Sequence, residues 1–252
     1  MTDSNAHQGH FSWHELFTND LEKAKGFYGE LLGWTIEPMT MGDGKEYPLI
    51  KAGDAGIGGM TPPPMEGAPA HWAGYVTVAD VDATAAKMIE LGAESLMDAF
   101  DVPGVGRIQG ISDPQGGKFL LFAPEGDEPN TEAGVGQWHW NELWAKDADA
   151  AATFYAEALG LEKKTMEMPN GSYFILEGEG GVPRAGIMTS PDASIPPHWA
   201  FYVQVDDVDA TRKKAEKLGG ATQGDVMEVP GVGRFGFITD REGARLGVIA
   251  PS

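Results

Sequence analysis

The hydrophobic pattern of the chain begins with a strict alternation. Residues 11–17 place every second side chain on the same side, which is typical of a strand. One face of this predicted strand combines aromatic rings with a carboxylate: Phe11, Trp13, Glu15 and Phe17. Apolar residues then recur at helical spacing from Ala24 to Leu31, and Gly33 follows. This spacing predicts an amphipathic helix that ends at the glycine.

The residues before this helix contain a start signal. Asn19 stands three residues before Glu22, which is the spacing of a capping box. Three strand-like segments follow the helix at residues 35–40, 46–51 and 56–60, separated by glycine-containing turns. The first quarter of the chain therefore has the predicted order β-α-β-β-β.

The same order returns after a proline-rich connector. A predicted strand at residues 71–78 precedes a helix at 80–91, and Gly92 closes that helix. Three more strand-like segments complete the second quarter: residues 94–102, 107–111 and 118–123. Each half of the chain is therefore expected to contain two β-α-β-β-β units.

The second half of the chain repeats the first. Trp13 and Glu15 recur as Trp140 and Glu142, a shift of 127 positions (13 to 140). The same shift relates His71 to His198, Tyr75 to Tyr202 and Arg107 to Arg234. One constant shift over the whole length indicates a tandem duplication. The predicted domains are residues 9–124 and 136–252, and residues 125–135 are the predicted linker.

Aspartates precede all four predicted helices. They are Asp20, Asp80, Asp147 and Asp207. Because Asp accepts hydrogen bonds from the first amides of a helix, these residues are expected to act as caps and not as catalysts.

Composition narrows the class of protein. The 252 residues contain no cysteine and carry a formal net charge of −20. Disulfides, thiolate metal sites and a cysteine nucleophile are therefore excluded. An acidic chain repels nucleic acid and anionic membranes, so neither is an expected partner. No apolar run approaches the roughly 18 residues of a membrane helix, and no signal peptide is recognised, so we expect a cytoplasmic protein.

Several motifs resemble one known superfamily. They are Glu-Leu-x-x-x-Asp with Phe-Tyr and Leu-Gly, then Val-x-Asp-Val-Asp-Ala, and Asp-Pro-x-Gly-Gly. These patterns are similar to the vicinal oxygen chelate superfamily of glyoxalases, extradiol dioxygenases and bleomycin-resistance proteins. The doubled start, Trp-His-Glu-Leu at residue 13 and Trp-Asn-Glu-Leu at residue 140, resembles its two-domain glyoxalase-like members. The resemblance implies an α+β fold in which each domain is an open eight-stranded cup that holds a small molecule.

The resemblance also implies where a metal ion would bind. Metal-dependent members use His, Gln and Glu side chains on the first, fifth and eighth strands. The matching positions in this chain are Trp13, Ala73 and Leu120, then Trp140, Ala200 and Gly247. None of these side chains can bind a divalent ion, so we predict neither metal nor cofactor. A displaced site built from Glu15 with His71, or Glu142 with His198, stays open as an alternative.

Glutamates among aromatic residues are the main catalytic candidates. Glu142 lies on one face with Trp138, Trp140 and Trp144, as Glu15 lies with Trp13 and Phe17. Burial would raise the pKa of such a carboxyl towards the range of a general base. The alternative is that each glutamate ties neighbouring strands together through hydrogen bonds.

The other candidates also recur in both halves. His71 and His198 either contact the ligand or are simple strand-end histidines. Tyr75 and Tyr202 offer hydroxyl groups at the wall of each cup. Arg107 and Arg234 would polarise a substrate oxygen, or would pair with Asp113 and Asp240. Expected ligand contacts are Trp13, Phe17, Ala73, Leu120, Trp140, Trp144 and Ala200.

Three functions are consistent with these residues. The first is binding of a small apolar or aromatic molecule, with metal-independent lyase or isomerase chemistry on a carbonyl compound. The second is a non-catalytic protein that sequesters a drug or toxin. The third is a metal-dependent glyoxalase or dioxygenase with relocated ligands. In each case we expect a small-molecule ligand and a monomer or homodimer.

Overall fold

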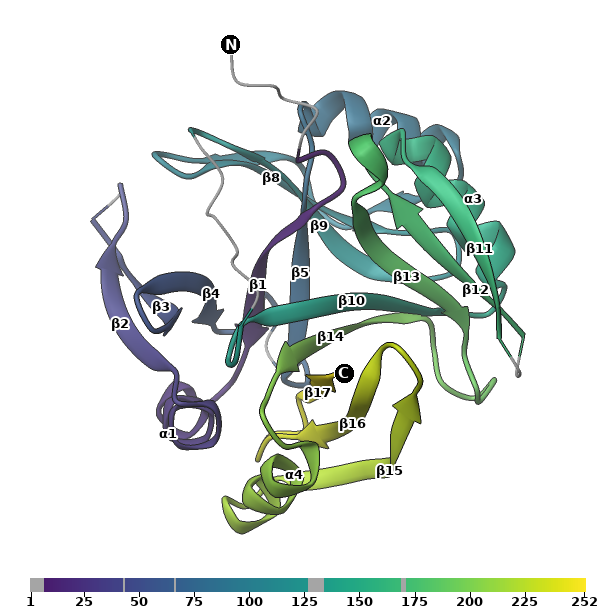
Figure 1. Cartoon of the computed structure of the whole chain (residues 1–252). Helices are drawn as coiled ribbons and strands as arrows, with labels where there is room; N and C mark the ends of the chain where they lie inside the picture. Colours follow the sequence, from purple (N-terminus) through teal and green to yellow (C-terminus); the bar gives the residue numbers. More distant parts are fainter. Residues whose placement is uncertain (1–6, 43, 66, 127–133, 169–170) are drawn as a thin grey trace. The chain divides into compact units, whose positions relative to one another are not determined.

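The described residues of the protein fold into two mixed sheets with four α-helices, as a computed structural model shows (Figure 1). The structure describes residues 7–42, 44–65, 67–126, 134–168 and 171–252. The predicted α+β class is confirmed, and so is the order β-α-β-β-β in the first, third and fourth quarters, whereas the second quarter has one more strand. Among the described helices, none combines the length and the apolar character that a membrane span requires.

The described part of the first half contains eleven elements. They are β1 (Phe11–Phe17), α1 (Leu21–Leu32), β2 (Thr35–Thr40), β3 (Glu46–Ala52), β4 (Ala55–Thr61), β5 (His71–Thr77), α2 (Val81–Glu90), β6 (Glu94–Ser95), β7 (Phe100–Val102), β8 (Gly106–Ser112) and β9 (Lys118–Pro124). The segment predicted as one strand over residues 94–102 is therefore two short strands, and both pair with β8.

The second half repeats this order. Its elements are β10 (Trp138–Ala145), α3 (Ala148–Leu159), β11 (Glu162–Met168), β12 (Gly171–Glu177), the 3-10 turn η1 (Glu179–Gly181), β13 (Pro183–Thr189), β14 (His198–Gln204), α4 (Val208–Lys217), β15 (Ala221–Val229), β16 (Gly233–Thr239) and β17 (Arg245–Pro251). Here the counterpart of β6 and β7 is the single strand β15.

The two sheets have equivalent strand orders. The first runs β2-β3-β4-β1-β5-β9-β8-β6, with β7 attached to β8, and the second runs β11-β12-β13-β10-β14-β17-β16-β15. The first strand of each half pairs in parallel with the fourth strand, so that Glu15 lies opposite Gly59 and Glu142 opposite Gly186. This equivalent register places the two candidate glutamates in corresponding positions.

Aspartate side chains begin all four α-helices, as predicted. Asp20, Asp80, Asp147 and Asp207 each accept a hydrogen bond from the backbone amide three residues later. The expected cap at Asn19 is wrong by one residue. Asp20 accepts from the amide of Lys23 at 3.1 Å, and an ionised carboxylate suits the positive end of a helix better than an amide does.

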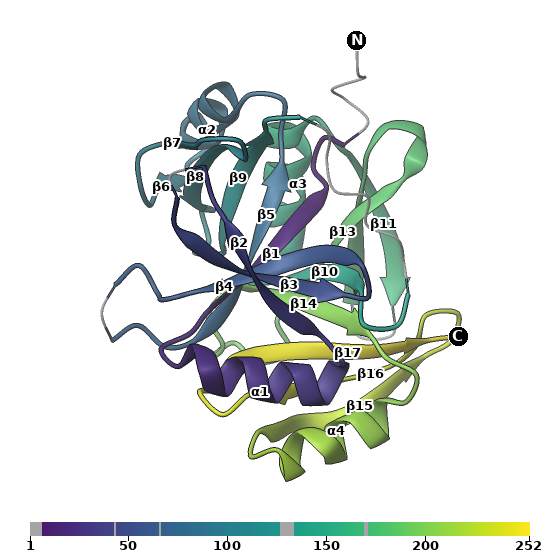
Figure 2. The same ribbon diagram turned by 90° about the vertical axis from the view of Figure 1, so that its left-hand side faces the viewer.

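The chain divides into two compact units that each take one quarter from each half. One unit comprises Met1–Ser12, Gly74–Glu128 and Asn141–Ala200. The other comprises Trp13–Ala73, Pro129–Trp140 and Phe201–Ser252. In the first unit α2 packs against α3 (Figure 1), and in the second α1 packs against α4 (Figure 2). The domain boundaries read from the repeat stay a prediction, and most of the predicted linker, residues 127–133, lies outside the described residues.

A loop from the other half holds the first helix of each half. Asp240, in the loop between β16 and β17, accepts a hydrogen bond from the Tyr28 hydroxyl of α1 at 3.1 Å. Glu242 of the same loop accepts from the amides of Asn19 and Asp20 at the start of α1. The equivalent contacts recur at α3, where Asp113 accepts from Tyr155 at 2.8 Å and Gln115 accepts from the Asp147 amide. These loops carry the Asp-Pro-x-Gly-Gly motif or its variant, which is therefore structural.

Candidate functional site

The first candidate site centres on a buried carboxylate. Glu15 on β1 is 5% exposed and accepts a hydrogen bond from the hydroxyl of Tyr47 on β3. The Tyr47 ring reaches Glu15 by crossing Gly59 on β4, since a Cβ atom on Gly59 would lie 1.8 Å from the hydroxyl. Gly59 is therefore required for the contact between the phenol and the carboxylate.

Trp13 and Tyr47 extend this contact into a chain of donors. The Trp13 indole donates from Nε1 to the Tyr47 hydroxyl at 3.0 Å, and Tyr47 donates to Glu15. Burial, and next the charge of Glu15, raise the pKa of Tyr47 well above 10. Tyr47 therefore keeps its proton at neutral pH and can act as a hydrogen-bond donor. Trp13, Phe17 and Tyr47 are each half-buried around the carboxylate.

The second half contains an equivalent cluster. Glu142 on β10 is 8% exposed, and its Oε2 accepts from the Tyr173 hydroxyl of β12 at 2.9 Å. Its Oε1 accepts from Trp144 Nε1 at 2.7 Å. From the sequence, these glutamates are either catalytic bases or acceptors that link neighbouring strands. The contacts support the second role, because each glutamate accepts a hydrogen bond from a tyrosine two strands away. The catalytic role stays a prediction.

Comparison of the two halves of the sequence does not identify Tyr47 and Tyr173 as equivalent residues. Tyr47 and Tyr173 are 126 positions apart, whereas the repeat shift is 127. The strand register recovers the equivalence: Met39 lies opposite Tyr47, and Met166, which is Met39 shifted by 127, lies opposite Tyr173. The hairpin between β11 and β12 is one residue shorter than the hairpin between β2 and β3. The two tyrosines therefore do not align at the constant shift of 127.

The candidate histidines lie at the ends of their strands. His71 Nδ1 lies 2.9 Å from the carbonyl oxygen of Pro69, and its ring is 5.1 Å from that of Phe17. His198 repeats this arrangement with the Pro196 carbonyl at 2.9 Å and the Trp144 ring at 5.3 Å. These contacts are those of the strand-end alternative, and a role in ligand contact stays a prediction.

Register places the candidate tyrosines on one face and the candidate arginines on the other. Tyr75 lies beside Leu120, and Tyr202 beside Gly247, across parallel strand pairs. Ala73 and Ala200 precede these tyrosines by two positions and are also buried. Arg107 lies opposite Ala123, and Arg234 opposite Ala250. Ala123 and Ala250 are three positions after Leu120 and Gly247, so their side chains point to the opposite face of the sheet. Alternation along a strand therefore directs the arginines to the face that carries the helices.

The expected partners of the arginines are wrong. Arg107 donates to both carboxylate oxygens of Asp82, at 2.7 and 2.8 Å, and to Asp101 at 3.0 Å. Arg234 donates to Asp209 at 2.7 Å. Asp82 and Asp209 lie in the first turns of α2 and α4, where they also suit the helix dipole. Asp113 and Asp240 are occupied by tyrosines and loop amides instead, so the arginines anchor helices.

The metal positions that the sequence resemblance implies do not fit a metal ion. Trp13, Ala73, Leu120, Trp140, Ala200 and Gly247 occupy them, as the sequence indicates. At Gly247 the space is also filled, because a Cβ atom there would lie 2.4 Å from the ring of Tyr202. The described part of the chain contains no group of three or more His, Cys, Asp or Glu side chains able to hold a metal ion.

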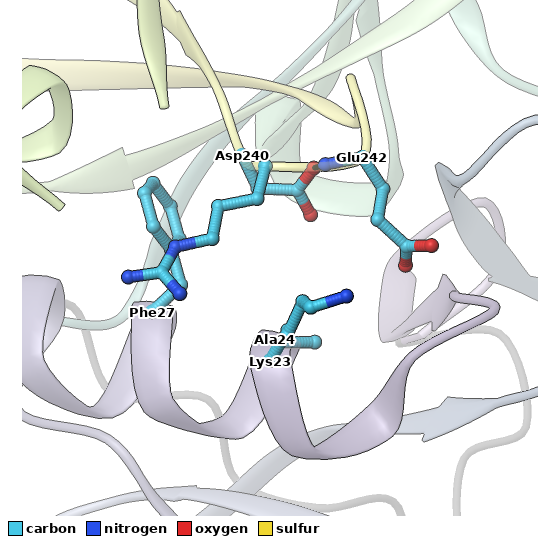
Figure 3. Close-up of a pocket in the computed structure, with 6 residues that line it drawn as sticks. Lys23, Ala24, Phe27, Asp240 and Glu242 are labelled. Atoms are coloured by element: carbon cyan, nitrogen blue, oxygen red, sulfur yellow. Dashed lines mark hydrogen bonds between the residues drawn. The ribbon is translucent and has the colours of Figure 1, made fainter. Parts of the chain in front are cut away.

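Two surface hollows lie away from the predicted ligand contacts. One is shallow and lies between α1 and the loop after β16, where Asp240 and Glu242 face Lys23, Ala24 and Phe27 (Figure 3). Its equivalent has a volume of about 120 Å³ and lies between Asp113, Gln115 and α3. Both hollows belong to the loop–helix contacts of the fold.

Replacing Gly59 with alanine is expected to separate Tyr47 from Glu15. The added Cβ atom would meet the Tyr47 hydroxyl and ring at 1.8 to 2.6 Å, so the ring must move away. We expect about 1 to 3 kcal/mol of lost stability, from overpacking and the broken contact. Urea unfolding of Gly59→Ala measures this, and the Gly59→Ala/Tyr47→Phe double variant should be no less stable than Gly59→Ala alone. An unchanged Gly59→Ala midpoint would contradict the assigned ring position.

Comparison with known proteins identifies the family. The model of the glyoxalase/bleomycin resistance protein/dioxygenase superfamily matches residues 137–248, and that of the bleomycin resistance protein-like N-terminal region matches residues 10–44. A relative from Mycobacterium tuberculosis, named "Putative glyoxylase CFP32", is 33% identical over 97% of this chain and 96% of its own length. The chain belongs to this superfamily. The resemblance read from the sequence motifs is therefore confirmed.

Other members of the superfamily show how far the likeness extends. The anthracycline biosynthesis protein DnrV of Streptomyces peucetius is 27% identical over 94% of this chain and 92% of its own length. The Mn(II)-bound glyoxalase from Novosphingobium aromaticivorans matches 97% of this chain and 82% of its own with a TM-score of 0.62 at 15% identity. The 2,3-dioxygenase LapB from Pseudomonas sp. KL28 gives a TM-score of 0.64 at 13% identity, over 97% and 92% of the two chains. At such low identity the two solved structures show the shared fold alone.

Proposed function

We propose that this chain binds a planar aromatic carbonyl compound at its glutamate–tyrosine–tryptophan clusters and moves a proton on it without a metal ion. One observation carries the proposal: a buried glutamate accepts a hydrogen bond from a tyrosine in both halves. In the first half Trp13, which occupies the family's first metal position, donates to that tyrosine. Carboxylates and phenols are sufficient for proton transfer at carbon.

The class of ligand follows from the surroundings of the glutamate. Trp13, Phe17 and Tyr47 are half-buried, and such aromatic side chains suit a flat apolar ligand. The name of the Streptomyces relative, an anthracycline biosynthesis protein, supports the same class, because anthracyclines contain fused aromatic rings with carbonyl groups. The mycobacterial relative is named a glyoxylase, which supports chemistry on a carbonyl compound.

The proposed step is a proton transfer that needs no oxidant or reductant. The Glu15 carboxylate takes a proton from an acidic C–H bond conjugated with the carbonyl group, and the electron pair moves to the carbonyl oxygen. As Glu15 becomes neutral, the Tyr47 hydroxyl shifts its hydrogen bond to the new oxyanion. The proton then returns to the same carbon or to another one. The second path is an isomerisation.

Deuterium exchange tests the proposal directly. Anthrone is a suitable probe because its C10 hydrogens are acidic and its oxygen lies on a planar tricyclic ring. Under argon in D2O, we expect the protein to accelerate exchange at C10, measured by NMR, and to keep this activity after dialysis against EDTA. Exchange at the buffer rate would contradict proton transfer. A stoichiometric metal ion whose removal abolishes exchange would favour relocated ligands instead.

A non-catalytic binding protein is the second candidate. One observation favours it: both carboxylate oxygens of Glu142 already accept hydrogen bonds, from Trp144 and Tyr173. A carboxylate held in this way supports the structure and need not exchange protons with a ligand. Anthrone that binds stoichiometrically and shows no accelerated exchange would select this function.

A further inference from the structure

A short segment at the edge of the first sheet carries three exposed apolar side chains. Leu96, Met97 and Phe100 are 48%, 41% and 41% exposed. They lie in and between β6 and β7, two strands that pair with β8 at the end of the strand order (Figure 2). Single exposed apolar side chains are common on protein surfaces, whereas a contiguous group of them marks an interaction site.

The strand register places the three side chains on one face of the sheet. A Cβ atom on Gly110 of β8 would lie 3.2 Å from Met97 Sδ and 3.4 Å from Leu96 Cβ, so both residues lie over this glycine. Phe100 lies opposite Ile108, which is two positions from Gly110 and therefore on the same face. Leu96, Met97 and Phe100 together form the apolar edge patch.

The second half of the chain folds without such a patch. The residues equivalent to Leu96 and Met97 are Gln223 and Gly224, and they lie in the continuous strand β15. The exposed leucine and methionine are therefore not required to form this edge of the sheet. Flexible methionine side chains are common on surfaces that adapt to a bound partner.

Carboxylates lie beside the apolar edge patch. Glu94 lies opposite Ser112, which is on the same face as Gly110, and Asp98 lies within the segment itself. Both carboxylates are exposed, and within the described part of the chain neither forms a hydrogen bond or an ion pair. Lys118 lies opposite Ser112 on β9, so the cations of a partner are expected over Glu94 and Asp98 and not over β9.

The charge of the whole chain favours the same kind of partner. A net charge of −20 attracts a cationic molecule from a distance and speeds its association. It repels an acidic partner, and that includes a second copy of this chain. Apolar contacts and local carboxylates then fix the position of the cationic partner at short range.

We propose that the apolar edge patch docks a basic amphipathic helix of another protein. Glu94 and the patch lie along residues 108–112 of β8, a length of about 14 Å. The apolar side chains at positions i, i+3, i+4 and i+7 of a helix extend over about 10 Å, so two helical turns match the patch. The inference does not depend on the proposed function, since none of these residues belongs to the glutamate–tyrosine–tryptophan clusters.

Labelled peptides test the docking surface. The probe is a leucine–lysine peptide of about 15 residues with its leucines at helical spacing. One comparison peptide has the same composition in scrambled order, and another has glutamate in place of lysine. By fluorescence anisotropy at about 0.15 M salt, we expect the wild type to bind the probe at least about 5-fold more tightly than the scrambled peptide. Binding of the leucine–glutamate peptide is not expected.

Variants that copy the second half assign this binding to the patch. Leu96→Gln/Met97→Gly introduces the residues that β15 already carries, so we expect the variant to fold. It should weaken binding of the leucine–lysine peptide by about 10-fold or more, because it removes two of the three apolar anchors. Met227→Gln, a change at an apolar residue of the second half that is 42% exposed, should alter the affinity by less than about twofold.

Three results would overturn the proposal. The first is a wild type that does not bind the leucine–lysine peptide. The second is equal binding of the probe by the wild type and Leu96→Gln/Met97→Gly, or of the probe and the scrambled peptide by the wild type, since net charge alone would explain either. The third comes from sedimentation velocity without peptide: a wild-type dimer that is lost in Leu96→Gln/Met97→Gly would assign the patch to a second copy.

Discussion

Replacing both Glu15 and Glu142 with glutamine is expected to lower the rate of anthrone exchange by about 100-fold or more. The change removes the proton acceptor but keeps the shape of the side chain, and the amide oxygen can still accept from Tyr47 or Tyr173. The fold should therefore survive. NMR exchange rates for the wild type, both single variants and the double variant measure the effect at equal protein concentration.

The single variants separate the two halves. Both oxygens of Glu142 accept hydrogen bonds from side chains, so Glu142→Gln places an amide NH2 against a donor, either Trp144 or Tyr173. We expect this variant to lose stability, and Glu15→Gln to cause most of the loss of exchange. Tyr47→Phe should reduce the rate less than Glu15→Gln, because it removes one donor to the oxyanion but leaves the base. Unchanged exchange in the double variant would end the proton-transfer proposal.

Much of the fold could be predicted because the pattern is doubled. Each helix has an aspartate before it, an apolar stripe and a glycine or leucine end, and each signal occurs at the same shift in both halves. The Asn19 cap failed because Asn and Asp are adjacent, and local sequence does not decide which one reaches the amide of Lys23. The prediction of one strand at residues 94–102 is wrong, because this segment forms two short strands, β6 and β7. Its counterpart in the second half is the single strand β15.

The candidate site was harder to predict, since side-chain partners depend on the sheet register. Glu15 was found from its aromatic face, but its partner Tyr47 comes from β3, and no pattern in a single strand indicates that pairing. For the arginines, the sequence pattern suggested a functional role where the structure shows a structural contact. Arg107 follows a turn that recurs in both halves, and it binds Asp82 on α2, as Arg234 binds Asp209 on α4. Repetition marks structural anchors as strongly as it marks catalytic groups.

Replacing Asp240 with alanine is expected to destabilise the protein by about 3 to 5 kcal/mol. Asp240 is 6% exposed and accepts three hydrogen bonds, from the amides of Glu242 and Ala244 at 2.9 Å and from the Tyr28 hydroxyl at 3.1 Å. Each buried donor left without an acceptor costs about 1 to 3 kcal/mol. Tyr28 also accepts from Trp72 at 3.1 Å, so the loss extends into the core beneath α1.

Urea unfolding at neutral pH measures this loss, and the duplication supplies a matched comparison. Asp113→Ala removes the same three hydrogen bonds from Gln115, Gly117 and Tyr155, so we expect a similar cost. Asp54→Ala, an exposed change, should stay within about 0.5 kcal/mol of the wild type. If Asp240→Ala behaves like Asp54→Ala, the loop does not hold α1 as the hydrogen bonds indicate.

The pH dependence of the same residue gives a signature that a simple packing loss would not produce. Burial raises the pKa of Asp240, and the hydrogen bonds from the loop amides and Tyr28 oppose that shift without cancelling it. A carboxyl whose pKa is higher in the folded state stabilises the fold fully below its unfolded pKa, and that contribution is lost as pH rises through the folded pKa. Asp240→Asn cannot titrate, and its amide oxygen can still accept from the loop amides. The unfolding free energy of the wild type relative to that of Asp240→Asn should therefore fall as pH rises from about 4 towards neutrality. A difference that stays constant with pH would show that burial does not destabilise the ionised Asp240 carboxyl.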